Sequence, residues 1–93
     1  MRILLDTHAL LWWLDGDVRL SRRARAAIGD VRTTCLVSAA SAWEITTKAR
    51  LGKLPGAHRD PFDRMLIAQS QAENLPLVSN DAVFDTYGIV RIW

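Results

Sequence analysis

The sequence contains little cysteine or histidine and no long apolar run. Its single cysteine, Cys35, cannot form an internal disulfide, and we expect a buried thiol in a reducing compartment. The longest apolar run is too short to cross a bilayer, and the chain does not open with a basic and then an apolar segment, as a signal peptide does. These absences argue against a disulfide-stabilised or membrane-embedded protein. They predict a cytoplasmic protein with no membrane partner.

Several common site motifs are absent as well. There is no Gly-x-x-x-x-Gly-Lys and no Gly-x-Gly-x-x-Gly, so a loop that cradles nucleotide phosphates is not expected. The two histidines, His8 and His58, do not have the spacing of zinc ligands. We interpret His58 as an exposed loop residue rather than a base, and His8 could equally be a surface residue of a helix.

The composition is that of one small globular domain. The chain has 93 residues, of which 49% are hydrophobic and 24% charged, so a single domain spanning 1–93 with a modest core is expected. The net charge of +2 permits a nucleic-acid partner without requiring one. A basic run is either a solvated helix face or a phosphate-tracking surface; it consists of Arg19, Arg22, Arg23 and Arg25. Three of the four tryptophans fall in helical apolar patterns, which favours core or interface positions over base stacking.

Short apolar runs alternate with helical patterns along the chain, which predicts an α/β fold with a parallel sheet. The expected strands cover 3–5, 34–37, 75–78 and 89–92. The expected helices cover 7–14, 21–29, 38–50 and a segment from 61 toward 74, with a short helical turn over 81–87. The first helix is apolar nearly all round, so we expect it to be buried or paired with another chain.

Acidic residues recur where strands end or helices begin. Asp6 directly follows the first strand, at the sheet edge where α/β proteins form sites, although it could simply cap a helix. Glu44 lies about two turns into the third helix and could instead belong to a capping box with Ser41. Asp63 and Asp81 could be first-turn acids that complement a helix dipole.

The joint pattern of these acids is more informative than any one of them, because all could converge on one edge of the sheet. Clustered carboxylates repel one another unless a cation lies among them. Oxygen ligands with open water positions suit Mg²⁺ or Mn²⁺, which can activate water and stabilise charge on a phosphoryl group. A receiver-type phosphorylation domain also clusters acids at strand ends, but it expects paired acids where Asp6 stands alone.

Four blocks of the sequence resemble PIN-domain ribonuclease toxins of the VapC type. In family order, they are MRILLDTHALLWWL at 1–14, VSAASAWEI at 37–45, HRDPFDRMLIAQ at 58–69 and LPLVSND at 75–81. The resemblance implies a three-layer α/β domain and a metal-dependent endoribonuclease toxin that cleaves RNA. It also implies a cognate antitoxin and a homodimer.

Within these blocks the resemblance also implies the site residues. The acids that would bind Mg²⁺ or Mn²⁺ and serve catalysis are Asp6, Glu44, Asp63 and Asp81. Supporting roles fall to Thr7 and Ser79, and to Asp60, which we interpret as a helix N-cap.

The middle of the sequence departs from the family. After 51–55 the family carries a helix, an edge strand and another helix, whereas here the next block follows almost at once. We therefore expect a truncated PIN-like domain of four strands instead of five, with an exposed edge or apolar patch that needs a partner, or with marginal stability. The segment 51–59 can span up to about 30 Å if extended, so Asp63 can still reach the site. The alternative is an inactive relic that serves as an antitoxin-binding or dimerisation module.

Overall fold

A four-stranded, all-parallel sheet forms the centre of the molecule. The computed structural model describes residues 1–51 and 61–93. The strands are β1 (Arg2–Leu5), β2 (Thr34–Val37), β3 (Leu77–Val78) and β4 (Arg91–Ile92), in the order β2-β1-β3-β4. The predicted four-stranded parallel α/β sheet is confirmed. The last two strands are shorter than expected. At the start of β3, Pro76 has no N–H for the ladder with β1, although its carbonyl still accepts from Leu4 N–H at 2.8 Å.

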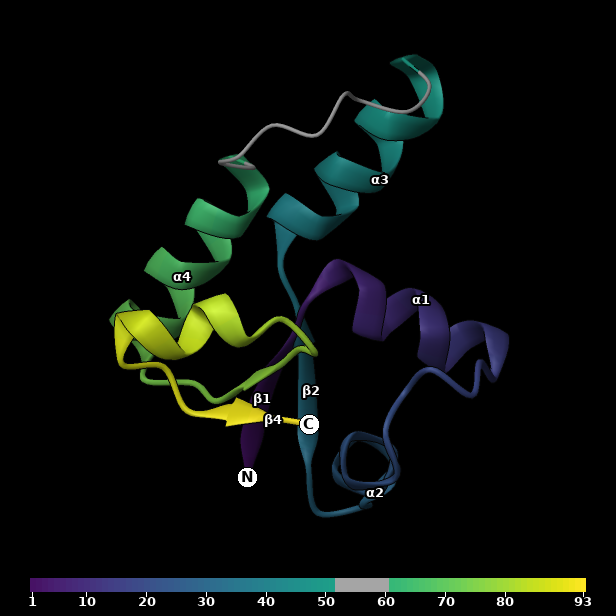
Figure 1. The fold of residues 1–93 in the computed structure, drawn as a ribbon, viewed down its shortest axis with the longest axis vertical. Helices are drawn as coiled ribbons and strands as arrows, with labels where there is room; N and C mark the ends of the chain where they lie inside the picture. The colour runs from purple at the N-terminus through teal and green to yellow at the C-terminus, as the bar shows by residue number, and fades with distance from the viewer. Residues whose placement is uncertain (52–60) are drawn as a thin grey trace.

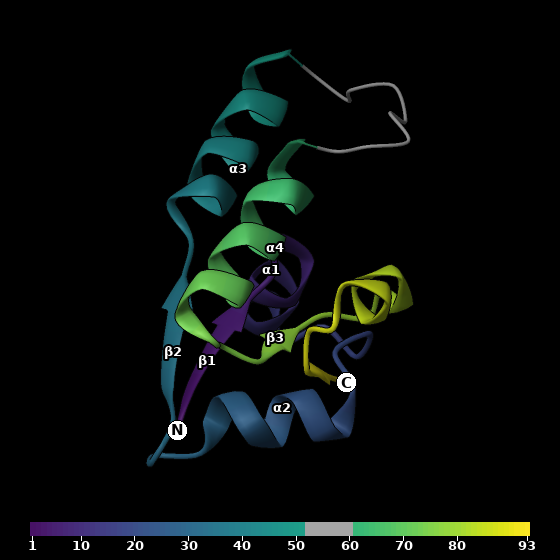
Figure 2. The ribbon, with the colours of Figure 1, turned by 90° about the vertical axis from the view of Figure 1, so that its left-hand side faces the viewer.

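Helices connect each strand to the next along the chain. They are α1 (Thr7–Asp15), α2 (Arg22–Gly29), α3 (Ala39–Leu51), α4 (Pro61–Glu73) and a 3₁₀ turn, η1 (Ala82–Tyr87). Helix α3 packs against α4 and α1, and Figures 1 and 2 show α3 and α4 side by side, projecting beyond the sheet. The predictions for His58 and Asp60 concern residues outside the described ranges.

The helix ends follow from local sequence chemistry. The Ser21 hydroxyl accepts Ala24 N–H at 3.0 Å and caps α2, as predicted. Gly16 ends α1 in the left-handed region at φ 63°, where a residue with a side chain would be strained. The Ser38 hydroxyl accepts Ala40 N–H at 3.1 Å and opens α3 at the predicted position.

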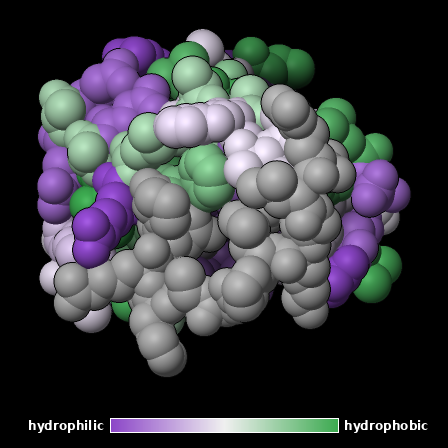
Figure 3. All heavy atoms as spheres, turned by 90° about the horizontal axis from the view of Figure 1, so that it is seen from above, coloured by the Kyte–Doolittle hydropathy of each residue, from purple (hydrophilic) through white to green (hydrophobic). Residues whose placement is uncertain are grey.

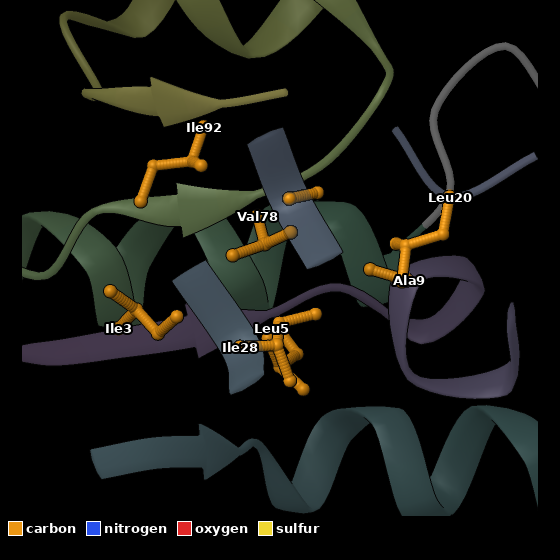
Figure 4. Close-up of a cluster of buried hydrophobic side chains, with 8 residues drawn as sticks. Ile3, Leu5, Ala9, Leu20, Ile28, Val78 and Ile92 are labelled. Atoms are coloured by element: carbon orange, nitrogen blue, oxygen red, sulfur yellow. The ribbon is translucent and has the colours of Figure 1, made fainter. Parts of the chain in front are cut away.

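Two hydrophobic cores on opposite faces of the sheet make the fold three-layered. Along β1, Ile3 and Leu5 face α1 and α2, whereas Leu4 faces α4 and η1. The first core, shown in Figure 4, also contains Ala9, Leu20, Ala24, Ile28, Val78 and Ile92. The second contains Leu66, Leu75, Leu77, Phe84 and Ile89. Alternate residues of β1 are buried on opposite faces of the sheet, so this one strand contributes side chains to both cores.

Several apolar side chains remain at the surface. Only Thr7 and Ala9 of α1 are buried, and Leu14 is 69% exposed, so this helix is not buried within the chain. No described residue pairs with the outer edge of β2, where Val37 is 48% exposed. Cys35 is half-buried rather than fully buried, and burial raises the pKa of its thiol. Within residues 1–51 and 61–93, no helix has the length and apolarity needed to cross a membrane.

Candidate functional site

A cavity of about 500 Å³ lies at the carboxyl edge of the sheet. All four predicted acids line it, together with three aromatic side chains: Asp6, Glu44, Asp63, Asp81, His8, Trp12 and Phe84. Figure 3 views the molecule from above, the end toward which β1 and β2 run in Figure 1, and shows hydrophilic and hydrophobic side chains interspersed on that face. The structure thus brings together side chains from four separate parts of the chain. Asp63 reaches the cavity despite the short middle segment.

Asp6 caps a helix and lines the cavity at the same time. One of its carboxylate oxygens accepts Ala9 N–H at 2.8 Å, so the simple capping interpretation is also correct. The side chain is buried, and burial raises its pKa above the ordinary value. Hydrogen bonds from Ser79 and from Ala9 N–H, with the charge of His8, partly offset that rise, while the charge of Glu44 adds to it. A nearby cation would favour the ionised form of this carboxyl.

Glu44 is buried and held by a hydroxyl from another helix. Thr7 Oγ1 donates to Glu44 Oε1 at 2.5 Å and lies 3.1 Å from Ser41 Oγ. All three side chains are buried, and Ser41 is fully so. Because α3 begins after Ser38, Ser41 lies inside the helix and cannot be its N-cap, which makes the capping-box alternative wrong. The contact instead links the start of α1 to α3 and orients the glutamate beside the cavity.

Asp63 and Asp81 open their own elements. Asp63 lies in the first turn of α4, where an acid complements the helix dipole. The Asp81 side chain accepts Val83 N–H at 3.0 Å and caps η1. Its own N–H donates to Ser79 Oγ at 3.1 Å, and Ser79 is fully buried. Ser79 also makes a hydrogen bond with the Asp6 side chain, so it links the loop after β3 to Asp6; its supporting role stays a prediction.

The four carboxylates surround the cavity but do not converge on one point. Among residues 1–51 and 61–93, no group of three or more His, Cys, Asp or Glu side chains lies close enough to hold a metal ion. The donor set, all carboxylate oxygens around open space, has the chemistry that Mg²⁺ or Mn²⁺ prefers. In their chemistry, the residues that line the cavity therefore fit such an ion.

Five residues that line the cavity were not predicted from the sequence to belong to the site: His8, Trp12, Asn80, Ala82 and Phe84. His8 and Trp12 are four positions apart on α1, so they share one helix face. This spacing was the available signal. The basic run turns out to be partly engaged elsewhere, since Arg19 pairs with Asp17 and Arg25 Nη2 donates to Asp17 O at 2.9 Å.

The comparison with known proteins shows a partial similarity. A stretch of 31 residues, 33% of this chain, is 64% identical to "Ribonuclease VapC16" of Mycobacterium tuberculosis. That stretch covers 22% of the relative's length. No family model matches the chain, and no solved structure matches it. The matched third of the chain is therefore similar to a VapC-type ribonuclease.

Proposed function

We propose that this chain is a Mg²⁺- or Mn²⁺-dependent endoribonuclease of the VapC toxin type, which hydrolyses RNA phosphodiesters. One observation carries the proposal: the acids at 6, 44, 63 and 81 all line one cavity at the carboxyl edge of a parallel sheet. In open α/β sheets, ligands bind at this edge. The similarity of one third of the chain to a ribonuclease supports the same chemistry.

The proposed reaction is attack of water on phosphorus. The new bond joins the water oxygen to phosphorus, and the bond from phosphorus to the leaving oxygen breaks. The water loses its proton to a cavity carboxylate, and the leaving oxygen takes a proton from solvent. A bound Mg²⁺ or Mn²⁺ would lower the pKa of coordinated water and stabilise charge on the phosphoryl group.

The chain's own residues supply position and charge. Asp6 is fixed by Ala9 N–H, and Glu44 is fixed by the Thr7 hydroxyl, so neither carboxylate is free to swing with solvent. Their burial strengthens their attraction for a cation because the local dielectric is low. Asp6 and Glu44 would therefore keep their positions beside a bound metal ion, and Asp63 and Asp81 would be its other carboxylate ligands.

The test is cleavage of a single-stranded RNA by wild type, Asp6→Asn and Asp15→Asn in Mn²⁺, with EDTA as the metal-free control. Asn is as good an N-cap as Asp, so Asp6→Asn keeps the fold while removing a charge. We expect Asp6→Asn to lower the cleavage rate roughly 100-fold or more. Asp15 is exposed at the far end of α1, so Asp15→Asn keeps full activity. Full activity of Asp6→Asn, or cleavage that persists in EDTA, contradicts the proposal.

A second candidate function is a catalytically inactive relic that binds an antitoxin or dimerises. The observation that favours it is the separation of the acids, since no described group of three can hold a metal without movement. Calorimetric titration with Mn²⁺ separates the two: the relic takes up no Mn²⁺ that depends on Asp6, whereas the nuclease does.

The proposal includes a cognate antitoxin and a homodimer. Two surface features support protein partners. Helix α1 exposes Leu14, and no strand in the described part of the chain pairs with the outer edge of β2. Apolar helix faces and open sheet edges are surfaces that proteins cover. Equilibrium sedimentation of the purified chain tests the homodimer, and a monomer at all concentrations overturns it.

A further inference from the structure

Beside the acids, the cavity has an aromatic wall that the proposed chemistry does not use. His8 and Trp12 line it, and their rings stack with centroids 5.6 Å apart and an interplanar angle of 22°. Both rings project from the same face of α1, one helical turn apart. We call this pair the aromatic step.

Two other side chains pack on the Trp12 ring of the aromatic step and hold it in place. The Arg19 guanidinium carbon lies 5.1 Å from the centre of the Trp12 ring, a cation–π contact. Arg19 is itself fixed by Asp17, with Nη2 to Oδ2 at 2.8 Å. Trp93, which follows β4, packs on Trp12 with ring centroids 5.8 Å apart. Trp12 is therefore a rigid support, and a ligand that stacks on the step does not have to order it first.

His8 is the more exposed residue of the aromatic step. Its side chain is exposed, while Trp12 is half-buried. In the described part of the chain, Trp12 is the one ring that stacks on the imidazole. Because His8 is exposed and lines the cavity, its imidazole offers surface on which a further flat ring can stack.

We propose that the aromatic step is a stacking subsite for one nucleobase of an unpaired RNA segment, next to the phosphate at the four acids. This inference rests on the proposed function. In a nucleotide, base and phosphate are neighbours, and Asp6 and His8 line the same cavity, so a phosphate at the acids leaves an adjoining base within reach of His8. Only an unpaired base can leave its own stack to lie on a protein ring. The step therefore selects single-stranded substrate with little preference among bases, since every base has a π face.

The test measures binding without cleavage. A fluorescein-labelled oligouridylate, and copies of it with a single abasic position, are titrated with the protein in EDTA and again in Ca²⁺. The variants are His8→Ala, His8→Phe and, as a matched control for an exposed aromatic outside the cavity, Trp43→Leu. Thermal unfolding of each variant confirms that it is folded.

We expect His8→Ala to weaken binding of the intact oligomer roughly 5- to 150-fold, the loss of one stacked base. His8→Phe keeps a flat ring and keeps the affinity. The oligomer whose abasic position falls at the subsite lacks the stacked base, so it already binds weakly to wild type. His8→Ala does not weaken the binding of that oligomer further. Trp43→Leu changes neither affinity, because Trp43 packs edge-on against Phe62 away from the cavity.

Three results overturn the subsite. The first is unchanged affinity in His8→Ala. The second is an equal loss for intact and abasic oligomers, which means that His8 acts on the phosphate. The third is a loss in His8→Phe as large as in His8→Ala, which means that the imidazole acts through its nitrogens. Failure of the proposed function gives a different result. If binding depends on the base but no Mn²⁺-dependent cleavage occurs, the subsite stands and the nuclease is wrong. If RNA is cleaved and His8→Ala leaves the kinetics unaltered, the nuclease stands and the subsite is wrong.

Discussion

The hydrogen bond between Thr7 and Glu44 ties the first helix to the third, and its removal has a calculable effect. Thr7→Val replaces the hydroxyl with a methyl of nearly the same shape, so packing is kept while the donor is lost. Thr7 and Glu44 are 9% and 5% exposed, so water cannot readily replace the donor. A hydrogen bond to a charged group contributes about 1.5–3 kcal/mol. For a domain of this size, a loss of about 2 kcal/mol lowers Tm by roughly 8–16 °C.

The assay is urea unfolding in EDTA, followed by circular dichroism, for four proteins: wild type, Thr7→Val, Glu44→Met and the double variant. Their double-mutant cycle isolates the coupling between the two side chains from what each loses separately. We expect a coupling energy of about 1–3 kcal/mol. Thr7→Ser is the control, since it keeps the hydroxyl and loses one methyl group, at a cost of about 0.8 kcal/mol.

The reasoning is refuted if Thr7→Val and Glu44→Met have additive effects. Additivity would mean that the two side chains do not interact in solution. It would also remove the physical reason for a fixed glutamate beside the cavity.

Three further predictions concern the metal, pH and the sheet edge. A hundredfold excess of Mn²⁺ over Kd raises the stability of wild type by about 2.7 kcal/mol, or roughly 10–20 °C in Tm, and leaves Asp6→Asn unchanged in a thermal scan; an equal rise in both removes Asp6 from the metal site. Burial raises the pKa of Asp6, so ionisation of this carboxyl lowers the free energy of unfolding. This loss of stability is absent below the ordinary pKa of 3.8 and complete above the raised pKa. Urea unfolding in EDTA should therefore show wild type losing stability relative to Asp6→Asn as pH rises through that window, and the opposite trend contradicts it. Thr34 N–H donates to Met1 O at 2.7 Å, so alternation turns the N–H of Leu36 toward β1 and those of Cys35 and Val37 toward the open edge. Hydrogen exchange in a monomer should be slow at Leu36 and fast at Cys35 and Val37; uniform protection means that the edge is covered.

Much of the fold was predictable because its signals are local. The apolar run at 34–37 predicts β2 with its observed bounds, and the Ser21 cap predicts the start of α2. The strands at the end of the chain were overestimated, because an apolar run shows which residues are buried and not which ones pair. Leu75 is in the core without belonging to β3, and Ile89 is in the core without belonging to β4.

The site was only partly predictable. The strand-end rule points to Asp6 and Asp81 directly, whereas Glu44 and Asp63 lie on helices and were included through the joint pattern of acids and the family resemblance. The contact of Thr7 with Ser41 joins residues 34 positions apart, so it depends on how α1 packs against α3 and leaves no local pattern. The metal itself stays a prediction, as do the catalytic roles of the acids.

The central position of β1 has a consequence for the time at which the cavity can form during synthesis. Leu4 pairs with Leu36 on one side and with Leu77 on the other, so β1 and β2 can associate long before β3 exists. At translation rates of about 5–20 residues per second, the ribosome needs roughly 2–8 s to go from β2 to β3. During that interval one edge of β1 and the second core lack their partners. Asp81 follows β3 in the sequence, so the four acids cannot all line the cavity of a nascent chain before β3 and Asp81 have been synthesised.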